Sequence, residues 1–310
     1  VALVGGRPIL KKVVPGSPAY KAGLRVGYQI VSVNGESFAN LKKTVESSGV
    51  FKNVIPFYLE KSVENRWYGS LGESVELVAK SGAFGTSKRY AFKLRTYEGL
   101  MSEQLGNFGT MPMEIETRIL EGEVAYLRFD IWFPGLMVAM RNFVRSLGDD
   151  VSGLVIDVRG NPGGIGLMAT GLAGMLVDEE FRMGTMRMRS GFLNFNVFPQ
   201  KGAFLGPVAV LIDGSSISTS EIFAASMQET GRARVFGSKS PGAALPSVFK
   251  KLPNRYYLQM AIADYETDKK RRIEGVGVLP DEAVALSPSK LRRGEDSVVV
   301  AARKWILRQN

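Results

Sequence analysis

Hydrophobic and polar residues alternate along the first part of the chain. This alternation predicts half-buried strands at residues 7–14, 28–35, 74–80 and 89–97. Turn signals separate these segments, among them Asn34-Gly35. Residues 41–68 predict a helix-like or irregular insertion. The pattern therefore predicts a small β-rich domain over residues 1–97.

Continuous apolar runs replace the alternation from residue 114 onward. They predict buried strands at 124–132, 153–158, 207–213 and 233–237. Helical spacing, or a run of small and apolar residues, predicts helices at 135–147, 165–177, 219–230 and 296–307. Because strands alternate with helices, we expect a mostly parallel sheet with crossover helices. This α/β core covers residues 114–310, and the weakly periodic residues 98–113 are predicted to be a linker.

The composition removes several kinds of chemistry. The 310 residues include no Cys, which excludes disulfides, thiol catalysis and thiolate metal sites. They also include no His, the commonest general base near neutral pH and the commonest metal ligand. Acid–base chemistry must then use Lys, Asp, Glu, Tyr or a terminal amine. The acidic pairs lack any calcium-loop pattern, and we expect neither a metal nor a cofactor.

The charge of the chain does not predict a nucleic-acid partner. The formal net charge is +10, but the Lys and Arg residues are scattered, and the densest run, residues 269–272, lies in a predicted turn. No stretch approaches the length of a membrane-spanning helix. The chain opens on VALVGG, with neither an initiator Met nor a signal peptide, so we expect a fragment or a processed form.

Two turns rich in glycine or hydroxyl groups follow predicted strands. They are residues 159–164 (RGNPGG) and 214–222 (GSSISTSEI). In a parallel sheet, sites form beyond the carboxyl ends of the strands, where both turns lie. The exposed amides of RGNPGG suit an oxyanion or another anion. Alternatively, its glycines serve only a tight turn.

Ser218 has two interpretations. Ser218 and Glu221 fit a capping box, which satisfies the first free amides of the following helix. Ser218 also suits a nucleophile, because the helix N-terminus favours developing negative charge. The Thr219 amide would then complete an oxyanion hole with Gly163 or Gly164. The local sequence leaves both interpretations open.

Five longer motifs occur in order: PGSPAYKAGLRVGYQIVSVNG, VAYLRF, GLVIDVRGNPGG, GSSISTSEIFAASMQETGRARVFG and EGVGVLPD. Together they resemble the carboxyl-terminal processing, or tail-specific, serine peptidases of family S41. The resemblance implies a crotonase/Clp-protease-like core and a PDZ domain that binds substrate carboxyl termini. It also implies an extracytoplasmic location. The implied nucleophile is Ser218, and the implied oxyanion hole uses Gly163 or Gly164 with Thr219.

The resemblance fails at the general base. Ala243 stands where the best-studied members carry the lysine of a Ser–Lys dyad. Another branch uses a His whose matching position is about Arg128, together with an acid that matches Glu274. Lys239 could replace the dyad lysine if burial lowered its pKa, or it is simply a solvated loop lysine. Lys239 and Glu274 therefore remain tentative catalytic candidates.

The function that we expect is a serine endopeptidase of the carboxyl-terminal processing type, acting on protein tails, with a non-standard or missing base. The alternative is a weak or inactive S41-like protein that binds peptides or lipophilic ligands. Crotonase-like acyl chemistry is a weaker third possibility, since no coenzyme A site is recognisable. The resemblance also implies that the carboxylate-binding loop of the PDZ domain falls at residues 4–7 and that the first strand is truncated. Arg7 either favours the carboxylate or is simply an exposed surface residue.

Overall fold

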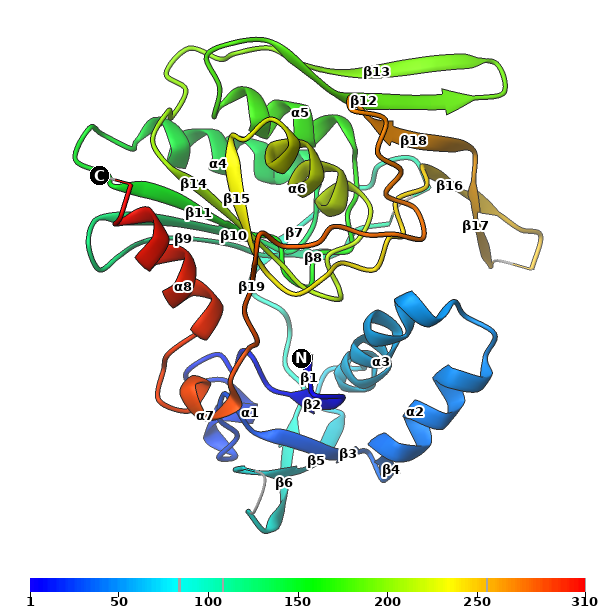
Figure 1. Ribbon diagram of the computed structural model, residues 1–310. Coiled ribbons are helices and arrows are strands. Elements are labelled where there is room, and N and C mark those ends of the chain that lie inside the picture. The colour runs from blue at the N-terminus through cyan, green and yellow to red at the C-terminus, as the bar shows by residue number, and fades with distance from the viewer. Residues whose placement is uncertain (83–84, 108, 255, 310) are drawn as a thin grey trace. The chain divides into compact units, whose positions relative to one another are not determined.

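The computed structural model describes residues 1–82, 85–107, 109–254 and 256–309 (Figure 1). It divides into two compact units. The first comprises Val1–Glu98 and Val284–Val300, and the second comprises Gly99–Ala283 and Ala301–Asn310. This division differs from the predicted boundaries, because residues 99–113 group with the second unit and Val284–Val300 with the first.

The first unit is built on an antiparallel sheet. Its strand order is β1 (Ala2–Val4), β2 (Arg7–Ile9), β3 (Gln29–Val33), β5 (Ser74–Lys80) and β6 (Ser87–Lys93), with β4 (Glu36–Ser37) paired to β3. The predicted insertion is helical, with α2 (Phe38–Ser47) and α3 (Ile55–Glu64) separated by a 3-10 turn at Lys52–Val54. Short helices α1 (Pro18–Lys21) and α7 (Pro288–Leu291) complete the unit, and a second 3-10 turn spans Asn65–Trp67. Leu24, Ile30, Val63 and Leu77 are buried in its core.

The second unit contains the predicted, mostly parallel sheet. Its order is β19 (Glu282–Ala283), β15 (Ala233–Gly237), β14 (Val208–Ile212), β11 (Gly153–Asp157), β10 (Val124–Phe129) and β9 (Ile115–Leu120). Only β9 pairs antiparallel with its neighbour. Every residue of β11 and β14 is buried, as their continuous apolar sequences require. In this order β11, β14 and β15 are neighbouring parallel strands. The segments that follow them therefore leave the sheet at the same edge.

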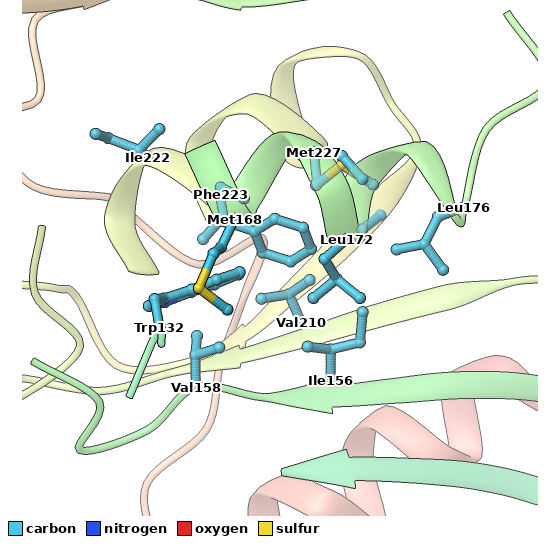
Figure 2. Close-up of a cluster of buried hydrophobic side chains, with 14 of the residues drawn as sticks. Trp132, Ile156, Val158, Met168, Leu172, Leu176, Val210, Ile222, Phe223 and Met227 are labelled. Carbon is cyan, nitrogen blue, oxygen red and sulfur yellow. The ribbon is translucent and has the colours of Figure 1, made fainter. Parts of the chain in front are cut away.

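Helices α4 (Pro134–Arg145), α5 (Leu167–Gly174), α6 (Thr219–Glu229) and α8 (Ser297–Ile306) match the predicted helices within a few residues. Figure 2 shows Met168 and Leu172 of α5, and Phe223 and Met227 of α6, packed with Ile156 and Val210 of the strands. This packing fixes the start of α6 relative to the sheet edge. Within the described residues, no helix is both long and apolar enough to span a membrane.

The remaining strands form smaller sheets. β12 (Phe181–Met188) pairs with β13 (Gly191–Val197) and with β18 (Ala263–Thr267). β16 (Ser247–Lys251) and β17 (Tyr257–Ala261) form a two-stranded hairpin. The predicted linker is partly regular, because β7 (Leu100–Met101) pairs with β8 (Pro112–Met113).

Candidate active site

The two turns singled out in the sequence lie against each other. Because β11 and β14 are paired in parallel, their following turns leave the same edge of the sheet. The Ile217 N–H donates to the Asn161 carbonyl at 3.0 Å, and the Thr219 hydroxyl donates to the Gly164 carbonyl at 3.0 Å. These contacts join residues far apart in the sequence.

Ser218 differs from its neighbouring hydroxyl residues. Ser215, Ser216 and Ser220 are buried, whereas Ser218 remains half-exposed. The Ser216 hydroxyl donates to the Val158 carbonyl at 2.8 Å, and the Ser220 hydroxyl donates to the Asn161 carbonyl at 3.1 Å. These hydroxyls hold the two turns together, which leaves Ser218 as the serine that a substrate can reach.

The Ser218 backbone is strained. Its φ is 56° and its ψ is −117°, in a region that costs a non-glycine residue about 1–3 kcal/mol. Ser218 is the N-cap residue of α6, and the Glu221 carboxylate accepts its N–H at 3.1 Å, which is the Glu221 half of a capping box. The predicted N-cap position of Ser218 is therefore confirmed. Capping does not exclude a second role, because the residue remains half-exposed.

The glycines of residues 159–164 have distinct roles. The Gly163 N–H donates to the Asn161 side-chain oxygen at 2.9 Å, so this donor is occupied. Within the described residues, the N–H groups of Gly164 and Thr219 donate to no acceptor. Gly163 instead provides close approach, since a Cβ at this residue would lie 2.7 Å from the Ser218 Cβ. The geometry thus favours Gly164 over Gly163 as a partner of Thr219 for an oxyanion.

A salt bridge that the sequence analysis did not single out supports the same turn. Asp157 ends β11 and accepts the Arg159 Nε–H at 2.9 Å and the Tyr126 hydroxyl at 2.8 Å. Burial alone would raise the pKa of Asp157, but the Arg159 guanidinium holds it well below its usual range. A single acid in an otherwise apolar buried strand is the sequence signal for such a pair.

A third segment, residues 240–245, lies beside Ser218 and contains Ala243. The Glu221 carboxylate oxygen that accepts the Ser218 N–H also accepts the Ala243 N–H, at 2.9 Å. Residue 243 is therefore held next to the candidate nucleophile. Its methyl side chain provides no base.

The two tentative bases lie elsewhere. The Glu274 carboxylate accepts the N–H groups of Ala244 and Leu245 at 2.7 and 3.1 Å, so it holds the backbone of the loop. Lys239 is exposed just after β15 and forms no hydrogen bond or ion pair with the described residues. Neither contacts Ser218 among the described residues.

Arg128, at the position of the histidine in the other branch, is partly buried near Glu114, 3.8 Å away. Burial would lower the pKa of Arg128, but Asp157 and other acidic neighbours raise it above its ordinary value. Arg128 therefore stays charged and cannot accept a proton. It belongs to the ionic cluster that surrounds Asp157.

The first unit contains the predicted carboxylate-binding segment. Residues 4–7 form the turn between β1 and β2, and Arg7 is exposed. Arg7, Gln29 and Arg292 line a cavity of about 460 Å³. Along the free edge of β1, the Leu3 N–H is already occupied by the Glu60 carboxylate, at 2.8 Å.

Comparison with known proteins decides the family. Residues 123–284, more than half of the chain, match the model of peptidase family S41. The chain belongs to peptidase family S41. Residues 9–47 match a PDZ domain. The S41 match covers β10, β11, β14 and β15 and the three site segments, residues 159–164, 214–222 and 240–245. The predicted combination of an S41 core with a PDZ domain is confirmed.

Named relatives agree with this S41 assignment. The chain is 26% identical over 283 residues to a carboxyl-terminal-processing protease of Picosynechococcus, covering 89% of this chain and 60% of that protein. It is 26% identical over 291 residues to the carboxy-terminal processing protease CtpB of Bacillus subtilis, covering 92% of this chain and 54% of that protein. The chain therefore spans less than two thirds of the length of these relatives.

Solved structures share the S41 fold. The photosystem II D1 C-terminal processing protease aligns with a TM-score of 0.57 and 22% identity, over 95% of this chain and 74% of that one. Mature CPAF aligns with a TM-score of 0.65 and 14% identity, over 99% of this chain and 80% of that one. These alignments confirm the predicted α/β architecture.

Proposed function

We propose that this chain is a serine endopeptidase of the carboxyl-terminal processing type, acting near the tails of protein substrates. The observation that carries the proposal is a partly exposed residue, Ser218, beside Gly164 and Thr219, whose N–H groups have no acceptor among the described residues. Preorganised backbone donors of this kind stabilise the oxyanion that forms in acyl transfer. The named relatives support the same reaction class.

In this mechanism the Ser218 oxygen attacks the scissile carbonyl carbon. The carbonyl oxygen becomes an oxyanion, which accepts hydrogen bonds from Gly164 and Thr219. The positive end of the α6 dipole lies at the same place and adds to the stabilisation. Gly163 leaves room for this geometry because it has no side chain.

The proton of Ser218 has no obvious acceptor. The family resemblance matches Ala243 to the dyad lysine, and no ionisable side chain among the described residues hydrogen-bonds to the Ser218 hydroxyl. Without a base, catalysis falls to about 10³–10⁴-fold over water, from binding and the oxyanion hole. We therefore propose a slow enzyme in which solvent water takes the Ser218 proton and a proton from water reaches the leaving amine as the scissile C–N bond breaks. A second water then hydrolyses the acyl group from Ser218.

A fluorophosphonate probe tests the nucleophile. We expect a covalent adduct on Ser218, detected by intact mass and peptide mapping, that is absent in Ser218→Ala. Ser238→Ala, which removes an exposed serine near the same sheet edge, is the matched control and should label normally. Failure of the parent chain to form an adduct at any pH from 5 to 10 would reject the peptidase proposal.

We propose that substrates are recognised through their carboxyl termini by the PDZ-containing unit. PDZ domains add a peptide to a sheet edge and hold its terminal carboxylate. A peptide with a free carboxyl terminus should bind in calorimetric titration, whereas its amidated form should bind at least tenfold more weakly. Equal affinities would contradict recognition of the terminus.

Ala243 specifically favours a second candidate, an S41-like binding protein with little or no turnover. In that case peptides or lipophilic ligands bind with measurable heat, but Ser218 forms no adduct. Titration and probe labelling on the same sample separate the two candidates.

An extracytoplasmic location is proposed from the family resemblance alone. Fractionation of cells that express the full-length protein should recover it outside the cytoplasm.

A further inference from the structure

Glu221 is a buried carboxylate without a cation beside it. It lies in the first turn of α6 with no exposed surface, and no Lys or Arg of the described residues forms an ion pair with it. A buried charge of this kind needs hydrogen-bond donors to replace water. Its carboxylate receives four: the Ser240 hydroxyl at 2.6 Å and the N–H groups of Gly242 at 2.6 Å, Ala243 at 2.9 Å and Ser218 at 3.1 Å.

The donors are divided evenly between the two oxygens. Oε1 accepts from Ser240 and Gly242, whereas Oε2 accepts from Ser218 and Ala243. Burial raises the pKa of Glu221 above its ordinary value, and the hydrogen bonds from Ser240 and the three amides offset that rise only in part. Because each oxygen already accepts two donors, little capacity remains to take a proton from the Ser218 hydroxyl. Glu221 is thus unsuited to be the missing base.

Its contacts connect the two sides of the site. Oε2 alone joins the N–H of the candidate nucleophile to the N–H of the residue at the family base position. Ser240, bound to Oε1, also accepts the Val278 N–H at 2.7 Å and so ties the network to the segment after Glu274. A positive φ such as that of Ser218 is unfavourable, so several surrounding contacts are needed to hold the residue in this conformation.

We propose that Glu221 is a positioning residue, which fixes Ser218 and residue 243 relative to each other through their backbone N–H groups. The effect of Glu221 on catalysis rests on the proposed function. Its hydrogen bonds to the Ser218 and Ala243 N–H groups can be measured independently of that function. Glu221 acts through Ser218 and does not touch the reacting atoms.

Glu274 provides a matched comparison. It is also an acid that binds the same loop, but it accepts only from Ala244 and Leu245, through one oxygen, and is half-buried. It has no contact with Ser218 among the described residues. Replacing Glu274 should therefore loosen the loop without releasing the Ser218 N–H.

Probe kinetics with Glu221→Gln and Glu274→Gln test the inference. We expect Glu221→Gln to lower the maximal rate of Ser218 labelling about 10²-fold, as loss of a preorganised group does. The half-saturating probe concentration should stay within about twofold, because the probe pocket is not altered. Glu274→Gln should lower the maximal rate less, by no more than about tenfold, because the Ser218 N–H stays bound to Glu221. Equal losses in the two variants, or no loss in Glu221→Gln, would overturn the proposal.

Hydrogen exchange tests the same inference without activity. In Glu221→Gln, exchange of the Ser218, Gly242 and Ala243 amides should accelerate, while the buried amides of β11 keep their protection. If the parent chain never labels, the proposed function fails, and this exchange pattern still decides the role of Glu221. If the β11 amides also lose protection in Glu221→Gln, the substitution has disturbed the fold, and a milder variant is needed. Ser240→Ala removes one hydrogen-bond donor to Glu221 and should accelerate exchange of the Gly242 amide. Unchanged exchange in that variant would also overturn the proposal.

Discussion

The candidate site has two sides that differ in completeness. The oxyanion side, residues 159–164 and 214–220, is joined by backbone and hydroxyl hydrogen bonds, and among the described residues the N–H groups of Gly164 and Thr219 have no acceptor. The base side, residues 240–245, is held as firmly, by Glu221 and Glu274, but ends in the methyl group of Ala243. Backbone positions depend on many contacts, whereas a base depends on one side chain. The proposed base side chain can therefore be replaced while the surrounding backbone contacts remain.

The largest expected effect comes from supplying a side chain to the base side. Ala243→Lys should raise the rate of Ser218 labelling by about 10²–10⁴-fold, the usual contribution of a general base. The loop already holds residue 243 beside Ser218, so no rearrangement is required. Leu245→Lys adds the same charge two residues away and should leave the rate unchanged. Equal rates in both lysine variants would show that residue 243 is not the base position.

The ionic support of the oxyanion side can be broken at Asp157. Asp157→Asn removes the negative charge of the Asp157–Arg159 salt bridge and should destabilise the fold by about 3–5 kcal/mol, measured by urea unfolding. The folded-state pKa of Asp157 lies below its unfolded value, so its stabilisation is present above that value and is lost as pH falls toward the folded-state pKa. The difference between parent and variant should therefore shrink in acid. The exposed Asp149→Asn is the control, and a constant difference down to about pH 2 would contradict the linkage.

Crowding at Gly163 tests the close approach of the two turns. Its φ is +95°, and a Cβ would meet the Ser218 Cβ at 2.7 Å. Gly163→Ala should cost about 1–3 kcal/mol from backbone strain alone, and it should also slow Ser218 labelling. Gly202 has a φ of +76° with open space around it, so Gly202→Ala isolates the backbone strain. Normal labelling in Gly163→Ala would mean that the turns are farther apart than the structure places them.

Lys239→Ala should have the smallest effect. The side chain is exposed and forms no contact with the described residues, so the labelling rate and its pH dependence should change less than about twofold. A tenfold loss would instead identify Lys239 as the base and would fill the gap on the base side.

The sequence was informative where a local pattern has one structural solution. The buried runs of β11, β14 and β15 predicted neighbouring parallel strands, and their order brought the two turns together. The capping pattern predicted the start of α6 at Ser218. These features depend on periodicity and on residues close in sequence.

The sequence could not predict which backbone N–H groups the side chains of other segments would bind. The sequence did not show which glycine amide is free to bind an oxyanion. In the structure the Asn161 side-chain oxygen accepts the Gly163 N–H, so the Gly163 amide is occupied. Likewise, the resemblance to one branch of the family made Glu274 a tentative catalytic candidate, and the sequence did not show that its carboxylate binds the N–H groups of Ala244 and Leu245. The grouping of Val284–Val300 with the first unit also depends on contacts between residues far apart in the chain.

A crystal structure of the Ser218 phosphonate adduct tests the proposed oxyanion hole most directly. We expect a phosphonyl oxygen about 2.7–3.1 Å from the N–H nitrogens of both Gly164 and Thr219, with the Gly163 N–H still bonded to Asn161. An adduct whose phosphonyl oxygen points to neither amide, or is held by Gly163 instead, would contradict it.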